Sequence, residues 1–227
     1  MISLILPVHN EHRNMKDNFL KIYKAVKDLG PFEIIIAEDG STDDTLLLAK
    51  RYARMKNVRL MSHAGRIGKG KAIKNGVAAA KGSVIGFMDV DLSVPLGYLG
   101  AAVESVSDGE QFVIGNRYAR GSKRSRKFGR LAESILYNAL MVLLFGSKVK
   151  DHQCGFKFWA SGFIKKYARM VNDNSWFFDS ELIVRAERSG ILPYEMPVDW
   201  KEGSTSNVSP STALYLFISM LRFRLRG

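Results

Sequence analysis

Short apolar runs alternate with longer amphipathic segments through the first half of the chain. The apolar runs cover residues 2–6, 33–37, 58–62 and 83–88, and the segments between them cover residues 11–29, 42–55 and 69–80. A fifth apolar run, at residues 111–115, closes this half. Alternation of strand-length and helix-length segments is typical of βαβ units. The pattern therefore predicts an α/β fold with a mostly parallel central sheet flanked by helices.

The second half has a different character. Residues 117–130 carry many basic and no acidic side chains, which predicts a mobile basic loop. Beyond it the pattern predicts an apolar helix at 131–145, a helix at 179–188, a strand at 191–198, a polar loop at 201–211 and a last helix at 211–226. Because no repeat or linker interrupts the chain, we expect a single domain over residues 1–227. The last helix combines an apolar run with Arg222, Arg224 and Arg226, so it is a candidate membrane-interface helix.

Composition narrows the classes of partner. The net charge of +12 indicates a polyanionic partner: nucleic acid, a phosphorylated substrate or an anionic membrane surface. The single cysteine, Cys154, excludes an intramolecular disulfide framework, and the four histidines lack zinc-ligand spacing. No segment reaches the roughly 18 to 20 apolar residues that span a bilayer, and the N-terminus lacks a signal-peptide pattern. We expect a cytoplasmic protein that is peripheral to a membrane.

The most informative feature is the carboxylate pair Asp89 and Asp91, which directly follows the apolar run at 83–88. Ligands of open α/β sheets bind at the carboxyl ends of the strands. Two carboxylates two residues apart in an extended segment point the same way and suit Mg²⁺ or Mn²⁺, which commonly bridge to phosphate oxygens. A lone pair of this kind is more often a solvated turn, so the prediction depends on the neighbouring strand ends.

Four consecutive predicted strand ends carry polar residues, which together describe a binding crevice. They are residues 7–11, 38–41, 65–70 and 89–91. Glu11 and Asp39 offer acceptors for ribose hydroxyls and a base N–H, and the glycines of the third end let the backbone approach a nucleotide. Neither a P-loop nor the Rossmann glycine pattern is present.

These residues resemble the inverting glycosyltransferases of family 2, which have the GT-A fold. The matching segments are PVHNE at 7–11, EDGSTD at 38–43 and DVDLS at 89–93. Segments at 115–118, 151–157, 178–182 and 200–204, with Arg130, Ser134 and Asn138, look most like the polyprenyl- or dolichyl-phosphate sugar synthases. Two positions depart from the usual motifs, Glu38 for aspartate and His9 for tyrosine, but each keeps a related polar group.

The resemblance implies a role for individual residues. Those expected to bind the nucleotide sugar are Pro7, His9, Glu11, Asp39, Gly68, Lys69 and Asp89, and those expected to hold Mg²⁺ or Mn²⁺ are Asp89, Asp91 and Ser93. Asp91, Arg117 and Arg130 are the expected catalytic residues. Arg117, Arg130, Ser134, Asp179 and Lys201 are expected to contact the acceptor phosphate or the sugar.

The implied reaction is inverting, metal-dependent transfer of a hexose from a nucleoside-diphosphate sugar to a polyprenyl or dolichyl phosphate. The segment at 151–157 favours a UDP-glucose-type donor slightly, and GDP-mannose stays open. Alternatives are a family-2 enzyme with a soluble or polysaccharide acceptor, a nucleotidyltransferase, and a basic nucleic-acid-binding module. The last lacks any recognition motif. We therefore expect an anionic membrane surface as a partner, and neither nucleic acid nor an obligate protein partner.

Overall fold

The computed structural model describes the backbone of residues 1–125, 128–201 and 210–226, and the side chains of these residues except 124–132 and 210. Within this part of the chain, seven strands form one sheet in the order β3-β2-β1-β4-β7-β5-β8. These are β1 (Ile2–Val8), β2 (Phe32–Glu38), β3 (Val58–Ser62), β4 (Val84–Met88), β5 (Phe112–Asn116), β7 (Phe156–Ala160) and β8 (Tyr194–Pro197). Only β7 runs antiparallel to its neighbours, so the predicted mostly parallel sheet is confirmed.

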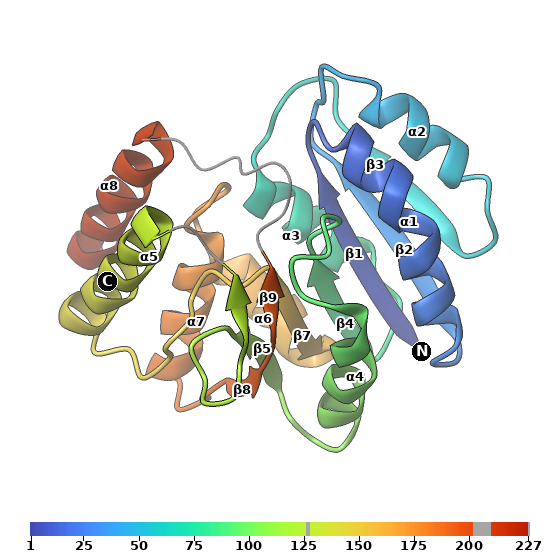
Figure 1. Cartoon of the computed structure of the whole chain (residues 1–227). Helices are drawn as coiled ribbons and strands as arrows, with labels where there is room; N and C mark the ends of the chain where they lie inside the picture. The colour runs from blue at the N-terminus through green and yellow to red at the C-terminus, as the bar shows by residue number, and fades with distance from the viewer. Residues whose placement is uncertain (126–127, 202–209, 227) are drawn as a thin grey trace.

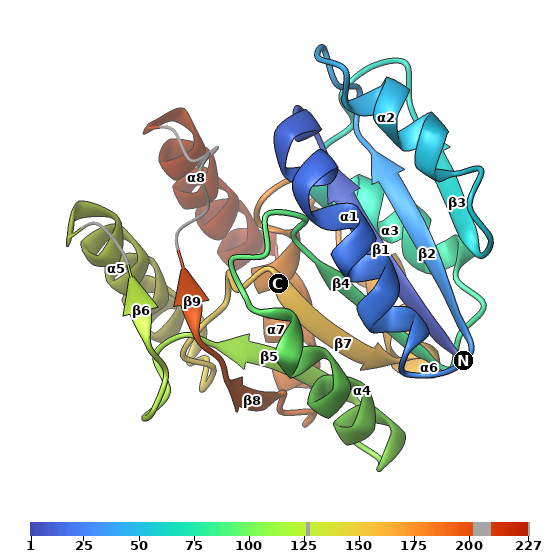
Figure 2. The same ribbon diagram turned by 45° about the vertical axis from the view of Figure 1, so that its right-hand side comes forward.

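Helices cover both faces of the sheet (Figure 1). They are α1 (His12–Lys27), α2 (Thr45–Tyr52), α3 (Lys69–Ala79), α4 (Leu99–Ser107), α5 (Phe128–Phe145), α6 (Ser161–Met170), α7 (Phe178–Arg188) and α8 (Pro210–Arg226), with a short 3-10 turn at Leu96–Tyr98. Helices α1 and α4 lie in front of the sheet, and α3 and α6 lie behind it (Figure 2). Strands β1 and β2 are apolar along nearly their whole length because both of their faces are covered.

The order of the strands positions the site. Chain order runs outward from β1 through β2 to β3, and then returns to place β4 on the other side of β1. Such a reversal opens a crevice at the carboxyl ends of the two central strands. Those ends carry the segments that follow Val8 and Met88, which include the predicted carboxylates.

A second apolar cluster lies beside the main core. It joins α5, α7 and α8 through Tyr137, Met141, Phe177, Val184, Leu216, Met220 and Phe223. Figures 1 and 2 both show α5 and α8 side by side, on the side of the molecule away from β3. Helix α7 contributes residues to both clusters, so it connects the helix pair to the sheet.

Several expectations need correction. The predicted basic loop is too long, because α5 begins at Phe128 and Arg117 is buried, with 7% of its surface exposed. Residues 124–125 pair as strand β6 (Arg124–Ser125) with β9 (Trp200–Lys201). The prediction also lacked α4, β7 and α6. Residues 126–127 of the predicted basic loop and residues 202–209 of the predicted polar loop lie outside the described residues.

Candidate active site

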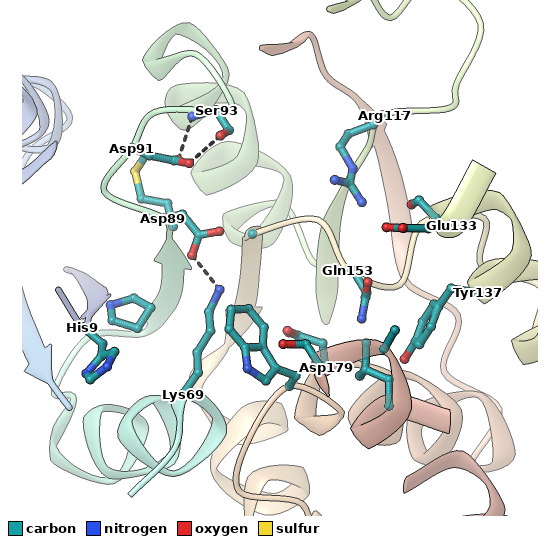
Figure 3. A pocket seen from close by; sticks show the side chains of 18 of the residues that line it. His9, Lys69, Asp89, Asp91, Ser93, Arg117, Glu133, Tyr137, Gln153 and Asp179 are labelled. Carbon is teal, nitrogen blue, oxygen red and sulfur yellow. Dashed lines mark hydrogen bonds and ion pairs between the residues drawn. The ribbon is translucent and has the colours of Figure 1, made fainter. Parts of the chain in front are cut away.

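A cavity of about 430 Å³ opens at the carboxyl ends of β1 and β4. Most of the predicted site residues line it: Pro7, His9, Glu11, Asp39, Lys69, Asp89, Asp91, Ser93, Arg117, Ser134 and Asp179. Figure 3 shows His9, Lys69 and the Asp89–Asp91 pair on one side of the cavity and Arg117, Glu133 and Tyr137 on the other. The lining residues extend from Pro7 to Met220, so segments from both ends of the chain meet at one crevice.

Both carboxylates of the aspartate pair are held by neighbours. Asp89 Oδ1 lies 2.7 Å from Lys69 Nζ. Asp91 accepts hydrogen bonds from the backbone N–H of Ser93 at 2.9 Å and from the Ser93 hydroxyl at 2.7 Å (Figure 3). Burial, and then the nearby negative charge of Asp89, raise the pKa of Asp91. A bound cation would relieve this repulsion, and Ser93 as placed orients Asp91.

Lys69 stays charged at this position. Burial by itself would lower the pKa of its ammonium, but Asp89 and then Asp179 more than offset that effect, so the pKa is raised. The ammonium also lies 5.4 Å from the ring centre of Trp176 and 5.6 Å from that of Phe87. Charge pairing and the two rings together stabilise a cation beside Asp89.

Asp39 organises the glycine loop. Its Oδ1 accepts hydrogen bonds from the backbone N–H groups of Ile67 at 2.6 Å and Gly68 at 3.1 Å. Gly68 has a φ of 98°, a conformation suited to glycine, and an added Cβ would come within 2.3 Å of the Asn174 carbonyl oxygen. The backbone carbonyl of Asp39 lies 2.7 Å from His9 Nδ1, which must donate because a carbonyl only accepts. These bonds leave the His9 Nε2 edge for a ligand.

The carboxyl group of Glu11 has a strongly raised pKa. Burial, followed by the charges of Asp91 and Asp89, raises its pKa to about 7, although a hydrogen bond from Asn14 at 2.6 Å acts in the opposite direction. A carboxyl with such a pKa changes its charge near neutral pH, which is common among functional groups.

Arg117 is held by Asp151 rather than projecting from a loop. Its Nε and Nη2 donate to the two carboxylate oxygens at 2.7 Å each, and its backbone N–H donates to Oδ2 at 2.9 Å. The guanidinium centre lies 5.6 Å from the ring centre of Trp200. Burial would raise the pKa of Asp151, but Arg117 lowers it below the usual 3.8. The arginine still lines the cavity, in a fixed orientation.

Of the remaining predicted residues, Ser134 and Asp179 line the cavity and Lys201 does not. The Ser134 hydroxyl shares a hydrogen bond with the Tyr118 hydroxyl. Asp179 lines the cavity with Oδ1 3.0 Å from Nζ of the fully buried Lys157. Lys201 is exposed on β9, where its backbone N–H donates to the Ser93 carbonyl at 2.9 Å, and it does not line the cavity. The side chain of Arg130 lies outside the described residues.

Two buried residues near the site, Glu181 and Cys154, have structural roles. Glu181 pairs with Arg185 at 2.7 Å and accepts the backbone N–H groups of Asn172 and Asp173, so it is a structural residue. Cys154 is fully buried, and burial raises its pKa to about 12, which excludes the thiolate that a catalytic cysteine needs.

One wall of the cavity is apolar and was not predicted. It comes from the facing sides of α5 and α8 and consists of Leu136, Tyr137, Leu140, Ala213, Leu216, Phe217 and Met220. Trp176, Trp200, Gln153 and Glu133 also line the cavity without having been proposed as site residues. The only sequence signal for this wall was the apolar character of the two helices, which is equally typical of a buried core.

The cavity offers a metal ion the carboxylates of Asp89 and Asp91 as ligands. No group of three or more His, Cys, Asp or Glu side chains with suitable geometry occurs among the described residues. Asp89 and Asp91 therefore fit a Mg²⁺ or Mn²⁺ ion that takes its other ligands from diphosphate oxygens and water, as such ions commonly do.

Known proteins resemble this chain in sequence. The chain is 35% identical over 214 residues to glycosyltransferase AglD of Haloferax volcanii, which covers 91% of the chain but only 34% of that relative. It therefore spans about a third of that protein's length. It is 28% identical over 242 residues to the dolichyl-phosphate beta-glucosyltransferase of Dictyostelium discoideum, covering 99% of the chain and 74% of the relative.

Solved structures agree on the fold. Glucosyl-3-phosphoglycerate synthase from Mycobacterium tuberculosis, in complex with Mn²⁺, UDP-glucose and phosphoglyceric acid, superposes with a TM-score of 0.71 at 19% identity, over 99% of this chain and 79% of that one. This likeness confirms the predicted GT-A fold. The family model described as Glycosyl transferase family 2 matches residues 3–168. The chain is thus a member of glycosyltransferase family 2.

Proposed function

We propose that the protein transfers a hexose from a nucleoside-diphosphate sugar to a polyprenyl or dolichyl phosphate, with inversion at the anomeric carbon. The observation that carries the proposal is the mixed lining of one cavity. One side of the cavity carries the carboxylate pair and Lys69, and the other side carries Arg117 and the apolar wall of α5 and α8. A soluble sugar acceptor would need no such wall, whereas a lipid phosphate has both a charged head and an apolar chain.

The nucleotide would lie at the ends of β1 and β2. Pro7, His9, Glu11 and Asp39 line that part of the cavity, and the Asp39 carboxylate keeps the Gly68 loop close to it. Lys69 and Asp89 would lie beside the diphosphate and the ribose. Several curated relatives of this chain are dolichyl-phosphate beta-glucosyltransferases, which favours a UDP-glucose-type donor over GDP-mannose.

Asp89 and Asp91 would hold Mg²⁺ or Mn²⁺, with Ser93 keeping Asp91 in position through its two hydrogen bonds. When bound, the metal supplies Lewis-acid stabilisation of the leaving nucleoside diphosphate. Lys69 adds a second positive charge on the same side, 2.7 Å from Asp89. Charge neutralisation of the leaving group is expected to be the largest contribution to the rate.

Arg117, Arg130 and Ser134 would bind the acceptor phosphate. Asp151 takes two of the guanidinium N–H groups of Arg117, so the remaining edge is presented in a fixed direction. A phosphate is already anionic near neutral pH, so the reaction requires positioning rather than a strong general base. Asp179, on the cavity wall, would contact sugar hydroxyls. Lys201 would reach the phosphates only by a side-chain movement, since it does not line the cavity.

The helix pair would also meet the membrane. Large apolar side chains of both helices are exposed: Ile135, Leu136, Val142 and Leu143 on α5, and Leu214, Phe217, Ile218, Leu221 and Leu225 on α8. Arg222, Arg224 and Arg226 lie among the latter and are suited to anionic head groups. No described helix is long and apolar enough to span a bilayer. From the exposed apolar and basic side chains of the helix pair, we propose that a single catalytic domain binds the cytoplasmic membrane face peripherally.

The proposal is tested with a panel of radiolabelled UDP- and GDP-sugars, polyprenyl phosphate and Mn²⁺, followed by extraction into organic solvent. Label in the organic phase from one donor supports the proposal and identifies the sugar. Label transferred only to water-soluble material would instead indicate a soluble acceptor. RNA or DNA binding with steep salt dependence and no sugar transfer would support the basic binding module.

A further inference from the structure

Asp89 is enclosed on one side and paired on the other. Its Oδ2 lies against Gly155, where an added Cβ would come within 1.9 Å of that oxygen, and its backbone N–H donates to the Gly155 carbonyl at 3.0 Å. The other oxygen, Oδ1, is paired with Lys69 Nζ at 2.7 Å. Both side chains line the cavity, and the Asp89 side chain is 36% exposed. A ligand that approaches this carboxylate from the cavity therefore meets the ammonium beside it.

Hydrogen bonds of the neighbouring backbone hold the start of α3, where Lys69 lies, in place. Lys69 is the first residue of α3, and the next two backbone N–H groups donate to the loop before α7: Gly70 to the Ser175 carbonyl at 3.2 Å and Lys71 to the Asn174 carbonyl at 2.9 Å. The lysine stem is flexible and carries a compact charge. A change of partner by the ammonium therefore requires only side-chain rotation.

We propose that Lys69 is a built-in counter-cation that occupies Asp89 until the sugar nucleotide arrives, so that the divalent metal and the nucleoside diphosphate bind interdependently. Without nucleotide, a metal must displace the ammonium from Asp89 and remain close to its positive charge. A diphosphate offers the ammonium a new anionic partner and leaves Asp89 for the metal. The inference rests on the proposed function, because it assumes that Asp89 and Asp91 serve a metal–diphosphate complex.

Coupling of this kind is reciprocal. If the nucleotide strengthens metal binding by some factor, the metal strengthens nucleotide binding by the same factor. Removing the Lys69 charge should therefore have two linked effects: tighter binding of the metal alone, and a smaller mutual enhancement. A lysine that only packed against Trp176 and Phe87 would produce neither effect.

The test measures Mn²⁺ dissociation constants of the full chain by electron paramagnetic resonance, without nucleotide and with saturating UDP or GDP. The variants are Lys69→Met, Lys69→Gln and the charge-conserving Lys69→Arg. Lys71→Met is the matched control, because Lys71 is exposed on the same turn of α3. Circular dichroism verifies that each variant is folded.

We expect Lys69→Met and Lys69→Gln to bind Mn²⁺ alone at least about tenfold more tightly than the unmodified chain, equivalent to about 1.4 kcal/mol. Their enhancement by nucleotide should fall by a similar factor. Lys69→Arg and Lys71→Met should stay within about twofold of the unmodified chain. A twofold or smaller change for both Lys69→Met and Lys69→Gln, or an equal gain for Lys71→Met, overturns the inference.

Hexose transfer separates this inference from the proposed function. Transfer to polyprenyl phosphate combined with unchanged Mn²⁺ affinity of the Lys69 variants would overturn the counter-cation and leave the transferase. If the unmodified chain binds no Mn²⁺ even with nucleotide, both the counter-cation and the metal role are wrong. Transfer in excess chelator would then show that the activity itself remains.

Discussion

Replacing Asp151 with asparagine should destabilise the protein strongly while leaving its shape almost unchanged. Asp151 is fully buried and accepts three hydrogen bonds from Arg117, which is itself 7% exposed. The asparagine amide would direct N–H groups at guanidinium N–H groups and leave the arginine charge without compensation. Removing one partner of a buried ion pair costs about 3–5 kcal/mol.

In a chain of this size, each 1 kcal/mol lowers the melting temperature by about 2–4 °C. We therefore expect Asp151→Asn to melt about 6–20 °C below the unmodified chain at pH 7, measured by circular dichroism. The control is Asp108→Asn, at the exposed end of α4. Because Arg117 is no longer oriented, the KM for the lipid phosphate should rise while nucleotide affinity stays within about twofold.

The stabilisation that Asp151 provides should disappear at low pH. The folded-state pKa of Asp151 is below its ordinary value of 3.8, so the stabilisation is present above about pH 4 and is lost as the pH falls through the lower, folded-state pKa. The difference in unfolding free energy between the two proteins should therefore shrink below pH 4. If Asp151→Asn melted within about 2 °C of the control Asp108→Asn at pH 7, the pair of Asp151 with Arg117 would not contribute this stability.

Three other perturbations address separate parts of the site. Asp91→Asn, or excess chelator, should lower turnover at least about tenfold, about 1.4 kcal/mol of barrier, and full activity in chelator would remove the metal role. The raised Glu11 pKa of about 7 means that the folded state holds a proton that the unfolded state has lost, so unfolding free energy should fall between about pH 5 and 7. Urea titrations should show that Glu11→Gln reduces this decline, to which Asp91 with its raised pKa also contributes. A profile identical to that of the unmodified chain would contradict the assignment. Changing Arg222, Arg224 and Arg226 to glutamine should weaken binding to anionic vesicles, by up to about 1 kcal/mol per charge, and so reduce sedimentation with them. Turnover on a short, water-soluble polyprenyl phosphate should not change.

Local patterns predicted the first four strands of the fold and the helices between them, but not α4. Strand β3 has the predicted bounds, and β1, β2 and β4 differ from prediction by one or two residues at an end. The reason is that each of these strands is a short, mainly apolar run, and helix-length segments lie between them. Asp89 and Asp91 followed from the same pattern, because the end of a parallel strand is also where a ligand binds.

Long-range contacts explain what the sequence did not reveal. Strand β7 contains Lys157, whose charge breaks the apolar pattern and is balanced by Asp179 on α7. Arg117 was predicted to be a site residue in a mobile basic loop, and its burial could not be predicted because its partner Asp151 lies 34 residues further along the chain. The apolar wall of the cavity exists only because α5 and α8, about 80 residues apart, pack side by side. No local pattern contains such pairings.

The chemical structure of the product tests the proposed hexose transfer to a lipid phosphate most directly. The purified chain is incubated with its sugar nucleotide, Mn²⁺ and polyprenyl phosphate, and the organic extract is analysed by proton and phosphorus NMR. We expect a hexose joined through its anomeric carbon to the lipid phosphate, with the configuration opposite to that in the donor. A product that remains in water, or a lipid-linked hexose with the donor's configuration, would contradict it.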